Sequence, residues 1–169
     1  MIEKLKRIIK TIISCIWRYF VFKRVASCGN NLHVNRYSKV SSSTYLGNNV
    51  NFNGMTIYGC GKVVIGDNFH SGRDCLMISE NHNYNQGDAI PYDSTYIPKN
   101  IIIKDNVWLG DRVIVLGGVE IGEGSIIQAG SVVVNDIPSC SIAGGHPARV
   151  FSKRDEKHYY LLKEKKAFH

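Results

Sequence analysis

Residues 103–138 read IKDNVW, LGDRVI, VLGGVE, IGEGSI, IQAGSV and VVNDIP, six consecutive groups of six. The first residue of every group is aliphatic, and the fifth is Val, Ser or Ile. A fixed period outranks local propensity, because each repeat buries its apolar side only by stacking on its neighbours. Neither a helical period nor simple alternation explains a strict six. The pattern predicts short strands joined by tight corners. First positions point into a narrow core and fifth positions supply small fillers, as in a β-solenoid.

The same period extends toward the N-terminus. Its first positions there are Val34, Val40, Leu46 and Phe52. Its expected fifth positions are Ser38, Thr44, Val50 and Thr56. A Gly-rich slip of one residue is expected at residues 58–61, after which Ile65 resumes the period and Cys75 falls on a fifth position as a core filler. Three sixes make one triangular coil, so about five coils are expected, with a height of about 24 Å at about 4.8 Å per strand.

Residues 80–99 interrupt this period with a polar and aromatic insertion, ENHNYNQGDAIPYDSTYIPK. A loop of this length in a compact domain is usually functional or disordered. It holds Asn81 and His82 and three tyrosines, at 84, 92 and 96. Two interpretations of the tyrosines remain open: they stack on a sugar ring, or they pack the loop itself.

Charge is concentrated at the two ends of the chain. Of the net charge of +7, residues 1–25 carry +6 and residues 150–169 carry +3, while the middle carries −2. This argues against a nucleic-acid-binding body and leaves cations for membrane phosphates at one end and a phosphorylated cofactor at the other. The five cysteines are odd in number and form no CxxC pair, which predicts reduced thiols and a cytoplasmic protein.

Residues 1–23 carry a helical apolar stripe: Ile2, Leu5, Ile9, Ile12, Ile13, Ile16, Trp17 and Phe20. The unbroken apolar run is too short for a membrane span, and no signal-peptide cleavage site follows. Two interpretations remain open together. The favoured one is a cap over the open end of the solenoid. The other is a helix in the membrane interface, at the inner face.

The expected division of the chain is an N-terminal helix or cap (1–30), a solenoid (31–154) with its insertion at 80–99, and a helical tail (155–169). The tail is expected to pack against a flank of the solenoid with solvated lysines.

Four segments carry a family resemblance: residues 103–110 (IKDNVWLG), 119–124 (VEIGEG), 127–133 (IQAGSVV) and 142–150 (IAGGHPARV). They resemble the C-terminal half of hexapeptide-repeat acyltransferases, in the xenobiotic, maltose and galactoside O-acetyltransferase group that includes O-acetyltransferases of bacterial surface polysaccharides. The resemblance covers about residues 34–154. It implies a left-handed β-helix, a homotrimer with active sites between neighbouring prisms, and acetyl-CoA as acyl donor, with no metal.

Acetyl transfer to a sugar hydroxyl requires a base and donors for the oxyanion. His82 aligns with the catalytic histidine of the family. That histidine follows an asparagine, as His82 follows Asn81 here. Glu80, Asp88 and Asp93 are all open as the carboxylate that orients its imidazole. Trp108 should face outward. The resemblance implies that it assists the reaction or holds the acetyl-donor arm, and the alternative is packing at the trimer interface.

Coenzyme A needs exposed backbone groups for its amide-rich arm and cations for its phosphates. Small residues expected to give backbone access are Gly110, Gly117, Gly118, Ala129, Gly130 and Ser131. Cations expected at the phosphates are Arg149, Lys153 and Arg154, with Pro147 beside them in Pro-Ala-Arg. His146 is a candidate for lining the same cleft. The remaining histidines are expected at the surface: His33, His70, His158 and His169.

The sequence therefore predicts an acetyl-CoA-dependent O-acetyltransferase acting on a surface-polysaccharide or lipopolysaccharide precursor. An amino-sugar N-acetyltransferase and a small-molecule acetyltransferase remain alternatives. A zinc hydratase on the same solenoid requires three converging histidines, whereas only His70 and His82 lie close in sequence. A non-catalytic scaffold at the membrane is the last alternative, and the Asn-His insertion argues against it.

Overall fold

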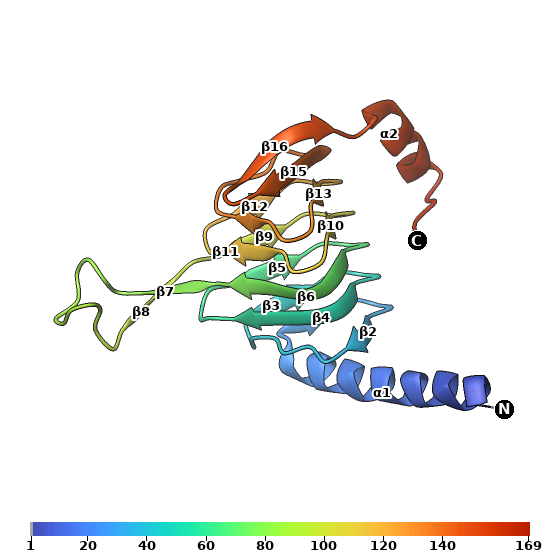
Figure 1. Cartoon of the computed structure of the whole chain (residues 1–169), viewed down its shortest axis with the longest axis horizontal. Coiled ribbons are helices and arrows are strands. Elements are labelled where there is room, and N and C mark those ends of the chain that lie inside the picture. The colour runs from blue at the N-terminus through green and yellow to red at the C-terminus, as the bar shows by residue number, and fades with distance from the viewer. Residues whose placement is uncertain (1) are drawn as a thin grey trace.

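A computed structural model of the chain describes residues 2–169 and shows a parallel β-solenoid of about six turns with one helix at each end (Figure 1). Helix α1 (Ile2–Arg24) runs across the first coil, and α2 (Glu156–Glu164) follows the last one. The strands are β1 (Ser27–Cys28), β2 (His33–Arg36), β3 (Thr44–Leu46), β4 (Asn51–Tyr58), β5 (Val63–Ile65), β6 (His70–Ile78), β7 (Glu80–His82), β8 (Tyr96–Pro98), β9 (Ile101–Ile103), β10 (Trp108–Leu109), β11 (Ile114–Leu116), β12 (Glu120–Ile121), β13 (Ile126–Ile127), β14 (Val132–Val133), β15 (Ser141–Gly145) and β16 (Ala148–Lys153). The predicted all-β solenoid with two terminal helices is confirmed.

The strands stack into three faces of a triangular prism. Face C contains β1, β3, β5, β9 and β12. Face A contains β2, the first halves of β4 and β6, and then β10, β13 and β15; face B contains the second halves of β4 and β6, with β11 and β14. Strands β4 and β6 are long because they run around the corner between faces A and B without a break. The corners are named from the faces they join: A–B (residues 72–74, 110–113 and 128–131), B–C (117–119) and C–A (104–107 and 122–125).

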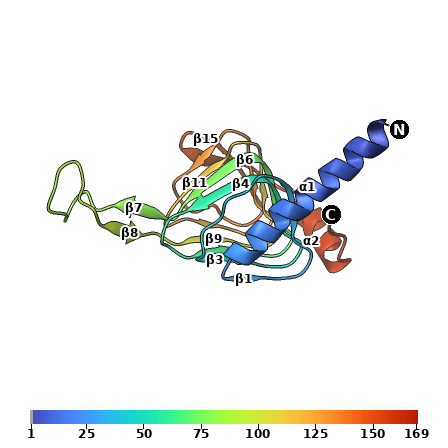
Figure 2. The same cartoon turned by 90° about the horizontal axis from the view of Figure 1, so that it is seen from below.

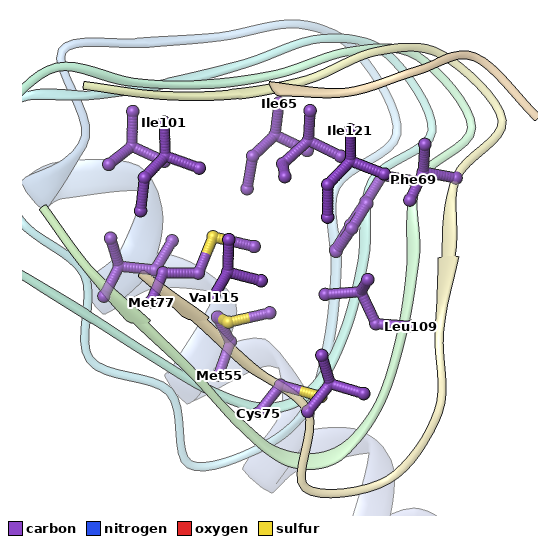
Figure 3. Packing of buried hydrophobic residues seen from close by; sticks show 14 of the residues in the cluster. Met55, Ile65, Phe69, Cys75, Met77, Ile101, Leu109, Val115 and Ile121 are labelled. Atoms are coloured by element: carbon purple, nitrogen blue, oxygen red, sulfur yellow. The ribbon is translucent and has the colours of Figure 1, made fainter. Parts of the chain in front are cut away.

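The predicted first positions form the core columns that Figure 3 shows in cross-section. Those of residues 103–133 are at most 1% exposed: Ile103, Leu109, Val115, Ile121, Ile127 and Val133. Cys75 is also buried at its fifth position, where burial raises the pKa of its thiol to about 11. The prediction that Cys75 fills the core is confirmed, since so high a pKa leaves almost no reactive thiolate.

Two details of the register were predicted wrongly. Met55 and Ile57 are buried and Thr56 is not, so Thr56 is no fifth position. The register shifts between Asn51 and Asn53, before the predicted slip, and the strand then continues through Gly54, which adopts φ of 102°. Ile137 bridges to Ile121 and therefore occupies a first-position column, because the last coil is shortened.

The insertion forms an arm that projects sideways from the prism (Figures 1 and 2). Strands β7 and β8 pair antiparallel, with His82 opposite Tyr96. The arm leaves at the B–C corner, between β6 and β9. Its tip is open to solvent, with Ile90 99% exposed.

Each terminal helix packs on the prism through a few residues. In α1, Val21 is buried, Trp17 meets the Tyr37 ring at 5.0 Å, and the Ser14 hydroxyl donates to the Val34 carbonyl. The second half of α1 thus closes the end of the solenoid, as the cap interpretation predicted. Within residues 2–169, no helix is both long and apolar enough to cross a membrane.

Asp155 caps the N-terminus of α2, and its carboxylate accepts from the His158 N–H. Its Lys163 forms an ion pair with Glu123 of the prism. The expectation that all the tail lysines are solvated is therefore wrong.

Candidate active site

His82 lies on β7 in a half-buried position near the root of the arm. Its ring stacks on that of Tyr92 with centroids 3.8 Å apart, and the Tyr96 ring lies 4.6 Å away at an angle of 39°. The Nδ1 atom is buried and has no hydrogen-bond partner among the described residues. Two aromatic rings of the arm therefore hold the imidazole, and one of its nitrogens is left without the partner that would fix its tautomer.

The three carboxylates expected to orient His82 do not contact it in one chain. Glu80 accepts from the Cys60 backbone N–H at 2.8 Å. Asp93 accepts from the backbone N–H groups of Thr95 and Asp88 and from the Thr95 hydroxyl, and the Thr95 bonds lower the pKa of this carboxyl. Glu80 and Asp93 are used in folding the arm, and Asp88 makes no side-chain hydrogen bond to His82. The expectation is contradicted for a single subunit.

The tyrosines and Asn81 divide between the two sides of the arm. Tyr92 and Tyr96 pack on His82, which supports the loop-packing interpretation for these two, while Tyr84 is 61% exposed. Asn81 is exposed and lies between Glu80 and His82 on β7. Because side chains alternate along a strand, Asn81 points to the opposite side from His82. Within one chain it is not placed beside the imidazole.

Trp108 faces outward from face A, as predicted, and is 49% exposed. It borders a pocket of about 450 Å³ between face A and the C-terminal tail. Asn51, His70 and Lys163 add polar groups to its wall, and Phe168 adds an apolar one. The carbonyl of the last residue, His169, accepts from Asn49 at 2.9 Å and so holds the tail against the pocket. The pocket suits a ligand with both polar and apolar surface.

His70 faces outward beside Trp108, as predicted, but it is only partly exposed because it lines this pocket. Burial, and then the nearby His169 side chain, lower the pKa of His70. The imidazole is therefore held more in its neutral form, which can donate through one nitrogen and accept through the other.

An asparagine ladder leads from the C–A edge of the prism to α2, and the sequence reasoning missed it. Four asparagines adopt left-handed φ and pass side-chain hydrogen bonds along the stack: Asn31, Asn49, Asn68 and Asn106. Asn106 then donates to the Tyr159 hydroxyl, which donates to Glu123. The available signal was an asparagine near the same corner of successive coils. The ladder fixes the pocket wall that α2 provides.

The small residues expected to expose backbone differ in their surroundings. A Cβ on Gly110 would lie 2.5 Å from the Ala129 nitrogen, and one on Gly117 would lie 2.2 Å from the Lys99 Cβ. These two glycines are needed for close packing. In contrast, Gly118 and Gly130 have positive φ, and an added Cβ would meet nothing within 4 Å.

Two further residues of this set also separate. Ala129 is exposed, as expected. Ser131 is buried, and its hydroxyl donates to the Gln128 carbonyl and accepts from the Gly145 N–H. The expectation that Ser131 lies open to a ligand is wrong, because it occupies an inward fifth position. The open residues also lie at different corners, Gly118 at B–C and Ala129 and Gly130 at A–B.

The three cations expected at the coenzyme phosphates do not converge. Arg149 pairs with Gly144 beside the exposed turn at His146 and Pro147, whereas Lys153 pairs with Ser141 at the other end of β16. Lys153 forms an ion pair with Glu156, and Arg154 donates to the Gly124 carbonyl at 2.6 Å. A single cluster of the three is contradicted, since the extended hairpin holds them apart. Arg149 stays exposed near the A–B corner.

One chain also keeps its two principal candidates apart. His82 lies on β7, in the arm that leaves the prism at the B–C corner (Figure 2). Trp108 lies on β10, which belongs to face A. Across residues 2–169, no three His, Cys, Asp or Glu side chains gather in a way that could hold a metal ion.

A stacked hexapeptide solenoid with a histidine-bearing arm defines the class of hexapeptide transferases. The family model described as bacterial transferase hexapeptide (six repeats) matches residues 100–135. The galactoside O-acetyltransferase of Escherichia coli K12 is 35% identical over 142 residues, which cover 80% of this chain and 68% of that protein.

Solved structures agree with this. A galactoside acetyltransferase in complex with coenzyme A superposes with a TM-score of 0.72 and 29% identity, over 83% of this chain and 71% of that one. A maltose O-acetyltransferase from Clostridium difficile 630 superposes with a TM-score of 0.61 and 29% identity, over 76% of this chain and 67% of that one. The chain belongs to the hexapeptide-repeat acetyltransferases, enzymes that transfer an acyl group from coenzyme A.

Proposed function

We propose that this acetyltransferase moves the acetyl group of acetyl-CoA onto a sugar hydroxyl, with His82 as the general base. The observation that supports this best is the His82 imidazole, held by Tyr92 and Tyr96 on a projecting arm and lacking a partner at Nδ1. A base positioned in this way can accept a hydroxyl proton at neutral pH.

The reaction balances with no covalent enzyme intermediate. The imidazole accepts the proton of the acceptor hydroxyl while the hydroxyl oxygen attacks the thioester carbonyl carbon. The tetrahedral oxyanion then expels the coenzyme thiolate as the C–S bond breaks. The imidazolium returns the proton to that thiolate, so the products are an acetyl ester and the free thiol. Backbone N–H groups at the corners are the candidate donors to the oxyanion.

The active site is proposed to form between two copies of the chain. The arm reaches away from its own prism and leaves Ile90 99% exposed, so it is built to meet another surface. A neighbour placed beside the prism would receive the arm over its own Trp108 pocket. The same contact repeated around an axis parallel to the prism closes a ring, and a homotrimer is the proposed assembly.

Acetyl-CoA is proposed to lie in the cleft between those copies. One subunit would offer its A–B corner, where the backbone at Ala129 and Gly130 is open and Arg149 is available to a phosphate. The other would offer its B–C corner, where Gly118 is open beside the root of the arm. This pairing explains why the open residues occupy two corners.

The acceptor is proposed to enter the pocket beside Trp108. An exposed indole can stack on the C–H face of a sugar, and Asn51 and His70 offer hydrogen bonds to hydroxyls. The pocket volume of about 450 Å³ accommodates one or two sugar units. A bacterial surface-polysaccharide or lipopolysaccharide precursor is the proposed acceptor class.

The test measures thiol release from acetyl-CoA in the presence of galactosides, maltose, nucleotide sugars and amino sugars, for wild type and His82→Ala. We expect acceptor-dependent release that His82→Ala lowers by about two orders of magnitude or more. The product should gain one acetyl group by mass spectrometry and lose it in mild base. A base-stable amide would identify an amino-sugar N-acetyltransferase instead. Wild-type activity in His82→Ala would contradict the proposed base.

A further inference from the structure

Helix α1 presents its apolar face away from the rest of the molecule. Ser14 and Val21 contact the prism. Ile12 and Ile16 each lie two positions from Ser14, about 200° around the helix, and so point outward. The outward residues form a stripe, hereafter the outer stripe, and all are 46–70% exposed: Ile2, Leu5, Ile9, Ile12, Ile16 and Phe20. A helix of a lone globular domain would turn such a stripe inward.

The outer stripe faces in a direction that a subunit beside the prism would not cover. Helix α1 runs across the end of the prism, and its first half extends beyond the prism edge (Figures 1 and 2). Its outward face therefore points along the prism axis, away from the first coil. A neighbour standing beside the prism, as in the proposed trimer, would leave this face open.

Basic side chains accompany the outer stripe. Residues 1–25 carry a net charge of +6, and Glu3 is their only acid. The seven cations are Lys4, Lys6, Arg7, Lys10, Arg18, Lys23 and Arg24. Arg7, Lys10 and Arg18 line a groove between the helix and the first coil, on the side opposite the outer stripe. Long basic side chains in this position can extend along the helix to phosphates at the level of its axis.

We infer that α1 lies in the surface of an anionic lipid bilayer, with the outer stripe among the acyl chains and the prism standing upright on the membrane. An apolar stripe on a helix rich in cations fits an anionic interface by both hydrophobic burial and charge. A second copy docked end to end through the same face would bring two segments of +6 together, which opposes that occupant. In the proposed trimer the three helices would share one plane, so they would bind the membrane together with increased avidity.

Flotation of the full chain with vesicles tests this inference. The vesicles contain phosphatidylcholine alone, or two parts of it with one part phosphatidylglycerol. Wild type should float with the anionic vesicles, while Ile12→Glu should lower the bound fraction about tenfold or more. The matched control is Leu161→Glu, which adds the same charge at an exposed residue of α2 at the other end of the prism, and it should float like wild type.

Thermal unfolding checks that Ile12→Glu folds, which is expected because Ile12 is 55% exposed. The inference is overturned if wild type does not float with the anionic vesicles or floats equally with the neutral ones. It is also overturned if Ile12→Glu floats with the anionic vesicles as much as wild type does. A further outcome also overturns it. In this outcome, wild type without lipid forms end-to-end pairs of the oligomer, and Ile12→Glu separates those pairs. Acetyl transfer to a soluble acceptor should be the same in wild type and Ile12→Glu, so loss of membrane binding and failure of the proposed chemistry are distinguishable.

Discussion

The ring of Tyr92 stacks on the imidazole of His82, with centroids 3.8 Å apart and planes inclined by 17°. Stacking rather than a carboxylate hydrogen bond holds the proposed base, because Nδ1 has no partner among the described residues. The orientation of His82 therefore depends on how well the arm packs around it. The contacts with His82 also account for two of the three tyrosines of the insertion, Tyr92 and Tyr96.

Replacing Tyr92 should lower kcat by loosening His82. We expect Tyr92→Ala to reduce kcat about tenfold, less than His82→Ala, because misplacing a base costs less than removing one. Tyr92→Phe keeps the stacked ring and should keep nearly full activity. Steady-state kinetics with both substrates measures this. Equal losses in Tyr92→Phe and Tyr92→Ala would assign the effect to the hydroxyl and not to stacking.

Removing the Trp108 indole should weaken substrate binding with little effect on stability. Trp108 is 49% exposed and borders the pocket, so Trp108→Ala should raise KM for the acceptor about tenfold and leave the unfolding midpoint unchanged. The control is Tyr45→Ala on face C, at an exposed aromatic residue away from the pocket, which should leave KM unchanged. An unchanged KM in Trp108→Ala would place the acceptor elsewhere.

The anchoring of α2 should depend on pH through Glu123 and Lys163. Burial opposes ionisation of Glu123, but hydrogen bonds from Lys163 and Tyr159 hold its pKa below the ordinary 4.5. Its stabilising contribution is therefore complete above pH 4.5 and is lost as pH falls through the lower folded pKa. The hydrogen bond to Glu123 raises the pKa of Lys163 above 10.5, so that contribution is complete below 10.5 and is lost as pH rises through the higher value.

Hydrogen exchange of the α2 amides across this range checks the prediction. Wild type should protect α2 most between about pH 5 and 10. Glu123→Gln should exchange faster in this window and lose the acid dependence. If the two proteins have the same protection at neutral pH, the ion pair does not anchor α2.

Substitution of Gly110 tests whether this residue is needed for close packing or for binding of the coenzyme. A Cβ at this position would lie 2.5 Å from the Ala129 nitrogen, so Gly110→Ala should destabilise the protein by about 1–3 kcal/mol. Ala129→Ser, at the exposed residue facing it, should leave stability within about 0.5 kcal/mol. Urea unfolding gives both values. An unchanged midpoint in Gly110→Ala together with a raised KM for acetyl-CoA would restore a cofactor role.

The sequence predicted those features that repeat or interrupt a repeat. The hexapeptide period located the core from Ile103 to Val133, because equivalent positions of successive coils have the same surroundings. The break in the period located the arm. The sequence did not reveal local irregularities of the strands: a register shift between Asn51 and Asn53 moved Thr56 away from its expected position. Ile137 entered another column because the last coil is shortened.

Site residues were harder to predict, because the folded chain and not the spacing in sequence decides their partners. Glu80 accepts from the Cys60 N–H, which lies 20 residues away. Asp93 accepts from the N–H groups of Asp88 and Thr95 and from the Thr95 hydroxyl, which only the folded arm brings together. Arg149 and Lys153 are four residues apart, but an extended strand separates them by about 13 Å and prevents a shared phosphate site.

The central claim is that one subunit supplies His82 and the next supplies the Trp108 pocket. Co-expression of His82→Ala and Trp108→Ala chains in equal amounts, followed by isolation of the mixed oligomer, tests it most directly. If sites form between copies, one of the three sites in every mixed trimer combines an intact arm with an intact pocket, so about a third of wild-type activity should return when the acceptor is kept well below its KM. Activity no higher than the average of the two parent variants, in oligomers shown to be mixed, would contradict the account.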